Sequence, residues 1–144
     1  MLVHMADFMT PSERSQRMSR IKGKDTRPEL LVRKALHAKG FRFRVNVANL
    51  PGRPDIVMRK YATVVLVHGC YWHAHNCQNG RIPSTNPLFW KEKFLSNRRR
   101  DARNARKLRQ LGWRVCVVWE CQLRTERLRE RTINNLANRL RRSV

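Results

Sequence analysis

Three of the five histidines and two of the four cysteines fall within the short segment Val67–Cys77. Imidazole and thiolate groups at this density can bind a metal ion, transfer protons, or do both. The whole chain carries 32 Lys and Arg against 10 Asp and Glu, a formal net charge of +22. Such an excess is more than solubility needs, and guanidinium groups match phosphate oxygens, which favours nucleic acid over an acidic membrane. The sequence therefore predicts metal chemistry on a nucleic acid.

The cysteines indicate a structural zinc site. Cys70, His75, Cys77 and Cys121 would give tetrahedral Cys₃His ligation, if the strand before Cys121 returns it to the same end of a sheet. We find no export signal, so we expect a reducing compartment, and disulfides are disfavoured. The alternative is a set of separately buried cysteines and surface histidines. Cys116 lies inside a β-branched run and is expected to be a small buried residue.

A second metal site is indicated at Asp55. Acidic residues are scarce in this chain, and Asp55 opens a predicted strand after a Pro-Gly-Arg-Pro turn. Mg²⁺ prefers hard oxygen ligands and keeps several waters, so one carboxylate at the end of a sheet suits hydrolysis of a phosphodiester. The alternative is that Asp55 is simply a turn residue.

The elements that position these groups follow from hydrophobic periodicity and capping signals. The pattern predicts one domain over residues 1–144, divided into a basic helical arm (1–24), a core (25–124) and a C-terminal helix (125–144). The expected class is α/β or α+β, with a mixed central sheet, an antiparallel meander within it, and flanking helices. We expect helices at 10–20, 26–39, 87–111 and 125–142, and strands at 41–47, 55–58, 62–67 and 113–120.

Four segments in this order resemble one enzyme family. They are LPGRPD at Leu50–Asp55, HGCYWH at His68–His73, LGWRV at Leu111–Val115 and VWEC at Val118–Cys121. Together they resemble the very-short-patch repair (Vsr) endonucleases, a branch of the PD-(D/E)xK nuclease fold, over about Ser15 to Arg124. The resemblance implies a nuclease core of this fold with a structural zinc site.

The resemblance also implies roles for particular residues. Asp55 matches the metal-binding aspartate, His73 the general base, and His68 a second active-site histidine. Glu29 matches an acid that supports the metal-bound waters, although it could instead serve a helix capping box. Asp101 matches an acid that orients the catalytic histidine, although it could instead pair with neighbouring arginines. The residues matching the zinc ligands are Cys70, His75, Cys77 and Cys121.

One departure from the wider fold concerns the strand after Asp55. That fold expects an acid and a lysine there, whereas this chain has Val65-Leu66-Val67-His68. His68 then takes the place of the lysine, as in the Vsr branch. The branch commonly has threonine at the position of Val67, so ligation of Mg²⁺ at this position would use the Val67 backbone carbonyl.

Several large side chains match family residues that wedge between bases beside a mismatch. Tyr71, Trp72 and Trp90 match the aromatic wedges, and Met18 matches a residue inserted from the other groove. Unstacking costs least at a mismatch, so wedging is itself a source of selectivity. The alternative for the aromatics is core packing, which is also what we expect of the two tryptophans that flank the last strand.

The expected function is a Mg²⁺-dependent endonuclease that nicks double-stranded DNA at T:G mismatches, with Zn²⁺ in a structural role. The alternatives are a nicking or restriction-associated endonuclease without mismatch preference, and a non-catalytic zinc-stabilised DNA-binding protein. We expect a monomer in the bacterial cytoplasm, associated with the nucleoid and with other mismatch-repair proteins. No membrane association is expected, because no segment is apolar over the length of a membrane span.

Overall fold

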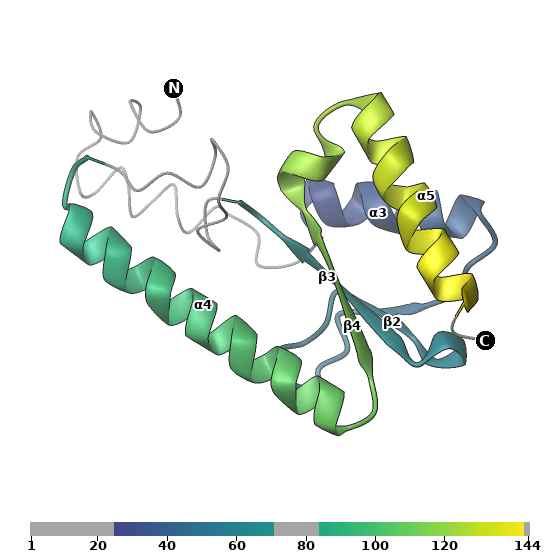
Figure 1. The fold of residues 1–144 in the computed structure, drawn as a ribbon, viewed down its shortest axis with the longest axis horizontal. Coiled ribbons are helices and arrows are strands. Elements are labelled where there is room, and N and C mark those ends of the chain that lie inside the picture. The colour runs from purple at the N-terminus through teal and green to yellow at the C-terminus, as the bar shows by residue number, and fades with distance from the viewer. Residues whose placement is uncertain (1–24, 71–83, 143–144) are drawn as a thin grey trace.

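A computed structural model of the chain describes residues 25–70 and 84–142, and the helix expected at 10–20 lies outside this part. In the described part of the chain, a helix precedes three successive strands, and a long helix, a fourth strand and a last helix follow (Figure 1). In order they are α3 (Arg27–Ala38), β1 (Arg44–Val45), β2 (Ile56–Met58), β3 (Thr63–His68), α4 (Pro87–Gln110), β4 (Arg114–Trp119) and α5 (Glu126–Arg142). Two 3₁₀ turns, η1 (Arg59–Tyr61) and η3 (Glu120–Leu123), follow β2 and β4.

The strands form one sheet in the order β1-β2-β3-β4. β1, β2 and β3 are antiparallel neighbours, whereas β3 and β4 run parallel. The parallel pair requires a crossover, and the long helix α4 lies in that connection. The predicted mixed sheet, with its antiparallel meander, is confirmed.

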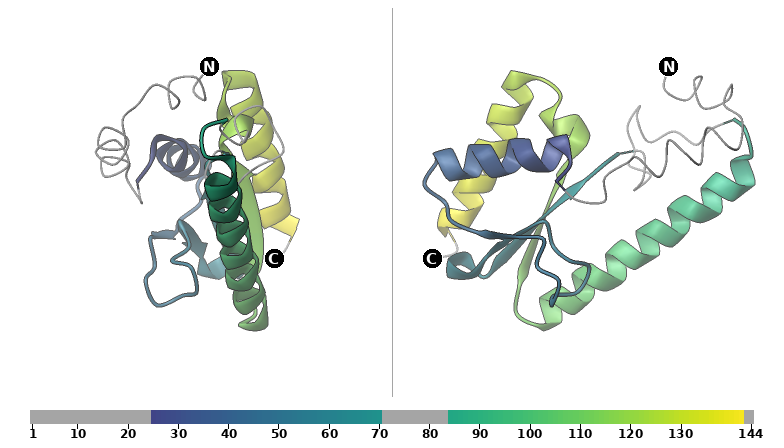
Figure 2. Two further views of the ribbon diagram at one scale, coloured as in Figure 1. Left: turned by 90° about the vertical axis from the view of Figure 1, so that its left-hand side faces the viewer. Right: turned by 180° about the vertical axis from the view of Figure 1, so that it is seen from behind.

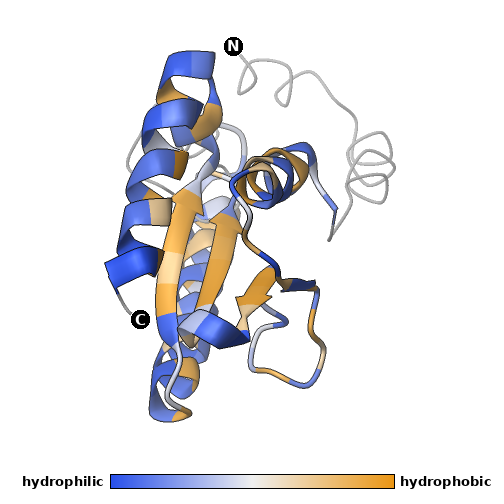
Figure 3. Cartoon of the chain, turned by 90° about the vertical axis from the view of Figure 1, so that its right-hand side faces the viewer, coloured by the Kyte–Doolittle hydropathy of each residue, from blue (hydrophilic) through white to orange (hydrophobic). Residues whose placement is uncertain are grey.

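Alternating residues of the strands face two different cores. Ile56, Val65 and Val118 belong to a large core that includes α3 and α5 residues, whereas Val57 and Val64 pack in a smaller core with Leu108 of α4. The alternation follows from the two-residue period of a strand. Helices α3 and α5 therefore cover one face and α4 the other, as the views in Figures 1 and 2 agree. The central strands are apolar on both faces (Figure 3).

The strand expected at 41–47 is much shorter than predicted. Only Arg44 and Val45 pair with β2, and both side chains are exposed. Phe41 is instead held by the end of α3, where its N–H donates to the Leu36 carbonyl at 3.1 Å. At the other end Asn46 has a left-handed φ of 49°, which turns the chain out of the ladder. Local backbone geometry at both ends therefore overrode the alternating pattern.

The remaining elements begin and end close to the predicted positions. Thr26 caps α3, accepting a hydrogen bond from the Glu29 N–H at 3.5 Å, and Pro28 lies in its first turn. Pro87 opens α4 as predicted. The last strand ends at Trp119 because Glu120 enters η3. Within the described residues no helix is long and apolar enough to cross a membrane.

Candidate active site

Asp55 lies directly before β2, and its side chain is bonded to the neighbouring strand. Its Oδ2 accepts a hydrogen bond from the Val67 N–H at 2.7 Å, near the end of β3. Burial raises the pKa of Asp55 from an ordinary 3.8 to about 7. The Val67 N–H and the charge of Arg33 lower this pKa, and the adjacent Glu29 carboxyl raises it. The structure thus brings the Asp55 carboxyl to the end of β3, while its expected role as a metal ligand stays a prediction.

Glu29, in the first turn of α3, is the acid that faces Asp55. Only 4% of Glu29 is exposed. Its Oε2 accepts a hydrogen bond from Nη2 of Arg33 at 3.2 Å, and its carboxyl is near enough to Asp55 to raise the pKa of that carboxyl. The Glu29 backbone N–H is used by the Thr26 cap, but the carboxyl points into the interior. The structure therefore brings together the two acidic residues that we expected at a metal site.

The same group contains three residues that the sequence analysis missed. Arg33 bonds to Asp25 through Nη1 at 2.7 Å and approaches Asn46 Oδ1 through Nη2 at 3.4 Å. Asn46 donates in turn to Asp25 Oδ1 at 3.0 Å. Arg33 follows Glu29 by one helical turn, which was the available signal, since residues four apart share a helix face.

His68 ends β3 at the same edge of the sheet. It pairs in register with Trp119 of β4, and the two rings meet edge to face with centroids 5.2 Å apart. His68 is half-buried, so its ring is oriented by packing yet retains some access to solvent. Val67 is buried beside it and donates its N–H to Asp55, while the expected ligation of Mg²⁺ by the Val67 carbonyl stays a prediction.

Two of the four expected zinc ligands come together at this edge. Cys70 is fully buried, and its Sγ accepts from the Cys121 N–H at 3.4 Å. Neither residue is in a disulfide, nor is Cys116, which is buried in β4 as predicted. Across residues 25–70 and 84–142, no three or more ligand-type side chains form a metal cluster. Zinc binding thus stays a prediction.

Asp101 and Trp90, both on α4, make the contacts expected under the alternative interpretations. These are an ion pair with a neighbouring arginine for Asp101 and packing in the interior for Trp90. Asp101 lies 3.8 Å from Arg100, and Trp90 is 3% exposed with its ring 5.8 Å from that of Phe94. Their expected roles, in orienting His73 and in wedging between bases, stay predictions. The remaining expected site residues lie outside the described part of the chain: Met18, Tyr71, Trp72, His73, His75 and Cys77.

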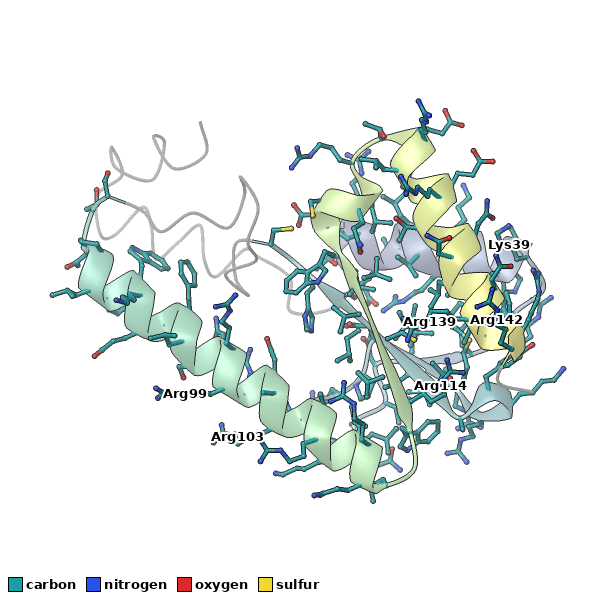
Figure 4. The ribbon with its side chains drawn as sticks, in the orientation of Figure 1. Lys39, Arg99, Arg103, Arg114, Arg139 and Arg142 are labelled. Carbon is teal, nitrogen blue, oxygen red and sulfur yellow. The ribbon has the colours of Figure 1, made fainter. Side chains whose placement is uncertain are left out.

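Basic side chains spread over both faces of the molecule. Arg99 and Arg103 lie along the outer side of α4, and Lys39, Arg114 and Arg139 gather with Arg142 near the end of α5 (Figure 4). A pocket of about 410 Å³ between α3 and η3 is lined by three further arginines. They are Arg27, Arg124 and Arg129. The predicted basic surfaces are therefore present, and those on α4 are strongly exposed.

Comparison with known proteins identifies the family. Residues 6–79 match the family model described as DNA mismatch endonuclease Vsr. The chain is 44% identical over 140 residues to the type II nicking enzyme V.NmeAIP of Neisseria meningitidis, covering 97% of this chain and all of that protein. It is 43% identical over 136 residues to the DNA mismatch endonuclease Vsr of Escherichia coli, covering 88% and 87% of the two chains.

These matches exclude the interpretation of this chain as a non-catalytic DNA-binding protein, because its relatives are named as endonucleases and nicking enzymes. The chain belongs to the Vsr family of DNA endonucleases.

Proposed function

We propose that this protein is a Mg²⁺-dependent endonuclease that nicks one strand of duplex DNA at a T:G mismatch, in very-short-patch mismatch repair. The observation that carries the proposal is the Asp55 carboxyl, bonded to the Val67 N–H at 2.7 Å at the end of β3, with the buried Glu29 carboxyl near enough to raise its pKa. Two carboxyls held together and desolvated repel each other when both are ionised, and a divalent cation removes that cost.

The residues present suit Mg²⁺. Glu29 and Asp55 supply hard oxygen donors, and a site with one or two carboxylates is typical for an ion that keeps several waters. Asp55 and Glu29 would hold Mg²⁺, which would supply positive charge to stabilise the charge that develops on the phosphate oxygens. The Val67 N–H fixes the direction of the Asp55 carboxyl, and packing on Trp119 fixes His68 nearby.

Proton transfer is assigned to His73. An imidazole can accept a proton from the attacking water near neutral pH, and His68 would then donate to the phosphate or to the leaving oxygen. The close spacing of His68 and His73 along the chain supports this division of roles, because His68 ends β3 at the edge where Asp55 is bonded.

A structural zinc ion would join the segment that follows β3, which contains His73, to the end of β4. The donor set suits Zn²⁺, because the Cys121 N–H donates to Cys70 Sγ, which brings these two residues together, and two further soft or borderline ligands, His75 and Cys77, follow Cys70 in sequence. Zinc would supply folding energy there and take no part in hydrolysis.

Two grounds support a preference for mismatched DNA. The Escherichia coli relative is named a DNA mismatch endonuclease. This chain also has the expected wedge residues Met18, Tyr71, Trp72 and Trp90. The Neisseria relative is named only as a nicking enzyme, so a mismatch-independent nickase is the competing function. Wedging between bases costs less at a mispair, and this favours nicking at mismatches over mismatch-independent nicking.

The test is a nicking assay on a labelled duplex with a single T:G pair and on its fully matched counterpart. We expect nicking of the mismatched duplex to require Mg²⁺ and Asp55→Asn to abolish it, with wild-type DNA affinity retained. Asparagine can still accept a hydrogen bond from the Val67 N–H. This variant therefore removes the negative charge of the carboxyl and keeps the hydrogen bond that supports the fold. Equal nicking of both duplexes would establish the mismatch-independent function, and Mg²⁺-independent nicking would refute the proposed metal site.

A further inference from the structure

The buried guanidinium of Arg33 joins the two halves of the candidate site. We propose that Arg33 is a positioning residue, which holds the Glu29 carboxyl and the backbone of Asp55 at the separation required by a shared divalent cation. This inference rests on the proposed metal site and goes beyond it, because Arg33 and its partners Asp25 and Asn46 are not among the proposed ligands.

The contacts of Arg33 come from three separate parts of the chain. Its Nη1 binds Asp25 Oδ1 at 2.7 Å, and its Nη2 lies 3.2 Å from Glu29 Oε2 and 3.4 Å from Asn46 Oδ1. The side chain of Arg33 is 12% exposed and that of Glu29 is 5% exposed. A planar guanidinium offers donors in a fixed fork, so these contacts define the position of the Glu29 carboxyl more tightly than a single charge would.

Asn46 extends the arrangement to Asp55. Its backbone N–H donates to the Asp55 carbonyl at 3.3 Å, while its side chain bonds to both Asp25 and Arg33. Asn46 adopts a left-handed φ of 49°, a conformation that asparagine tolerates better than most residues. Arg33 therefore contacts Glu29 directly and reaches the Asp55 backbone through one intermediary.

The charges of the group favour a divalent cation. The carboxyls of Asp25 and Glu29 pair with the Arg33 guanidinium, and Asp55 is within the influence of its charge, so these four side chains carry a formal charge of −2 when all are ionised. One divalent cation makes the group neutral. A monovalent cation would leave one uncompensated charge in a largely buried position, which is costly at low dielectric.

Stability alone does not account for this arginine. Its Nε is buried and finds no hydrogen-bond partner among the described residues, and an unsatisfied buried donor is destabilising. Buried ion pairs are also often no more stabilising than apolar residues of the same volume. An ordinary salt bridge between residues one turn apart on α3 would need neither the burial nor the contacts to Asp25 and Asn46. A positioning role explains both the burial of the guanidinium and its contacts to Asp25 and Asn46.

The test compares Arg33→Lys with the wild-type protein. Lysine keeps the positive charge but has a single ammonium group, which cannot reach Asp25, Glu29 and Asn46 together. We expect the Mg²⁺ concentration for half-maximal nicking to rise by about tenfold or more, the range found when groups supporting metal ligands are changed. Excess Mg²⁺ should restore much of the maximal rate. Lys34→Met, an exposed change at the next position on α3, should leave the half-maximal concentration unaltered.

A second variant and a second measurement separate positioning from folding. Asn46→Ala leaves the Arg33–Glu29 pair in place and removes the side-chain link towards Asp55, so a smaller rise of the same kind is expected. The Mg²⁺-induced increase in melting temperature, recorded on each folded variant, should weaken in parallel with the nicking data.

The outcomes are distinct. A half-maximal Mg²⁺ concentration in Arg33→Lys within about twofold of wild type, or an equal change in Lys34→Met, would overturn the role of Arg33 while leaving the metal site intact. Loss of nicking in Arg33→Lys at every Mg²⁺ concentration, with a wild-type Mg²⁺-induced melting shift, would also overturn it. If wild-type nicking itself ignores Mg²⁺, the proposed metal site fails, and the positioning role fails with it.

Discussion

The ionisation of Asp55 makes the stability of the metal-free protein depend on pH. Replacing Asp55 by asparagine imitates the protonated carboxyl, since the amide can accept from the Val67 N–H and donate to Glu29. Burial, the largest influence, raises the pKa of Asp55 to about 7, so the folded state binds the proton more tightly than the unfolded chain does. The wild-type protein should therefore lose stability as pH rises, and the variant should lose less.

The pKa values set both the range and the size of this effect. Below pH 3.8 the carboxyl is protonated in both states, and above about pH 7 it is ionised in both, so the stabilisation is lost between these limits. The rise from 3.8 to about 7 corresponds to about 4 kcal/mol, at ~1.4 kcal/mol per tenfold change in proton affinity. This value is an upper limit, because the carboxyl keeps some contact with solvent.

Urea unfolding at a series of pH values measures the effect. The free energy of unfolding of wild type and Asp55→Asn is compared from pH 4 to pH 8, without Mg²⁺ and without a chelator, so that any thiolate-bound zinc is retained. Between pH 4 and pH 8, the free energy of unfolding of wild type should fall by up to about 4 kcal/mol more than that of the variant. Glu92→Gln on the exposed surface of α4 controls for the loss of one negative charge from a chain of net charge +22.

Mg²⁺ supplies the complementary measurement. At pH 8, Mg²⁺ at about 100 times its dissociation constant should add ~2.7 kcal/mol to the stability of wild type and little to that of Asp55→Asn. Parallel pH profiles for the two proteins would show that the Asp55 carboxyl ionises in the folded protein as it does in the unfolded chain. The reasoning from burial and the Glu29 contact would then be wrong.

Three further predictions concern other parts of the molecule. Cys70→Ser should reduce bound zinc, measured by metal analysis, and lower the melting temperature, because Cys70 is fully buried against Cys121. Gly52→Ala should cost about 1–3 kcal/mol in urea unfolding, since Gly52 has a φ of +74° and a Cβ there would lie 2.8 Å from Asn104. The double change Arg99→Ala and Arg103→Ala on α4 should lower the slope of log DNA affinity against log salt by about one per lost phosphate contact.

Matched variants decide these three cases. Cys116→Ser, in the middle of β4, should leave the zinc content unchanged, and equal zinc loss would remove the distinction between the two cysteines. Gly40 also has a positive φ, but a Cβ there would meet no atom within 4 Å. If Gly40→Ala lowers stability as much as Gly52→Ala does, the contact with Asn104 contributes nothing to the loss. Lys91→Ala with Lys93→Ala is the matched pair on α4, and the same change in slope there would show a diffuse charge effect rather than local contacts.

Regular patterning predicted the elements that have a single strong period. The uninterrupted β-branched run of β3 and the apolar stripes of α3 and α5 gave the right element types and nearly the right ends. β1 failed because its pattern competed with two local backbone constraints: Phe41 is tied to the end of α3, and Asn46 leaves the ladder in a left-handed conformation. Periodicity carries no information on either constraint.

The candidate site was predictable where the ligands themselves are distinctive and not where supporting groups are ordinary. Asp55 was found because acids are scarce, and Glu29 was assigned only through family resemblance. Arg33 was missed because it is one of many basic residues in the chain, and nothing local marks it as the one that is buried. The distinguishing facts are tertiary: its helix packs so that Asp25 and Asn46 both reach the same guanidinium.

The same carboxyl that would hold the metal also fixes the register of the sheet. β2 has only three residues, all buried, so few ladder hydrogen bonds hold it against β3. A shift by one position would exchange its two faces and turn Asp55 away from Glu29. The bond from the Val67 N–H to Asp55 opposes such a shift, and Val67 is 8% exposed, so losing its partner would leave a largely buried donor unpaired. Asp55→Ala should therefore lower both activity and stability, whereas Asp55→Asn should separate the two.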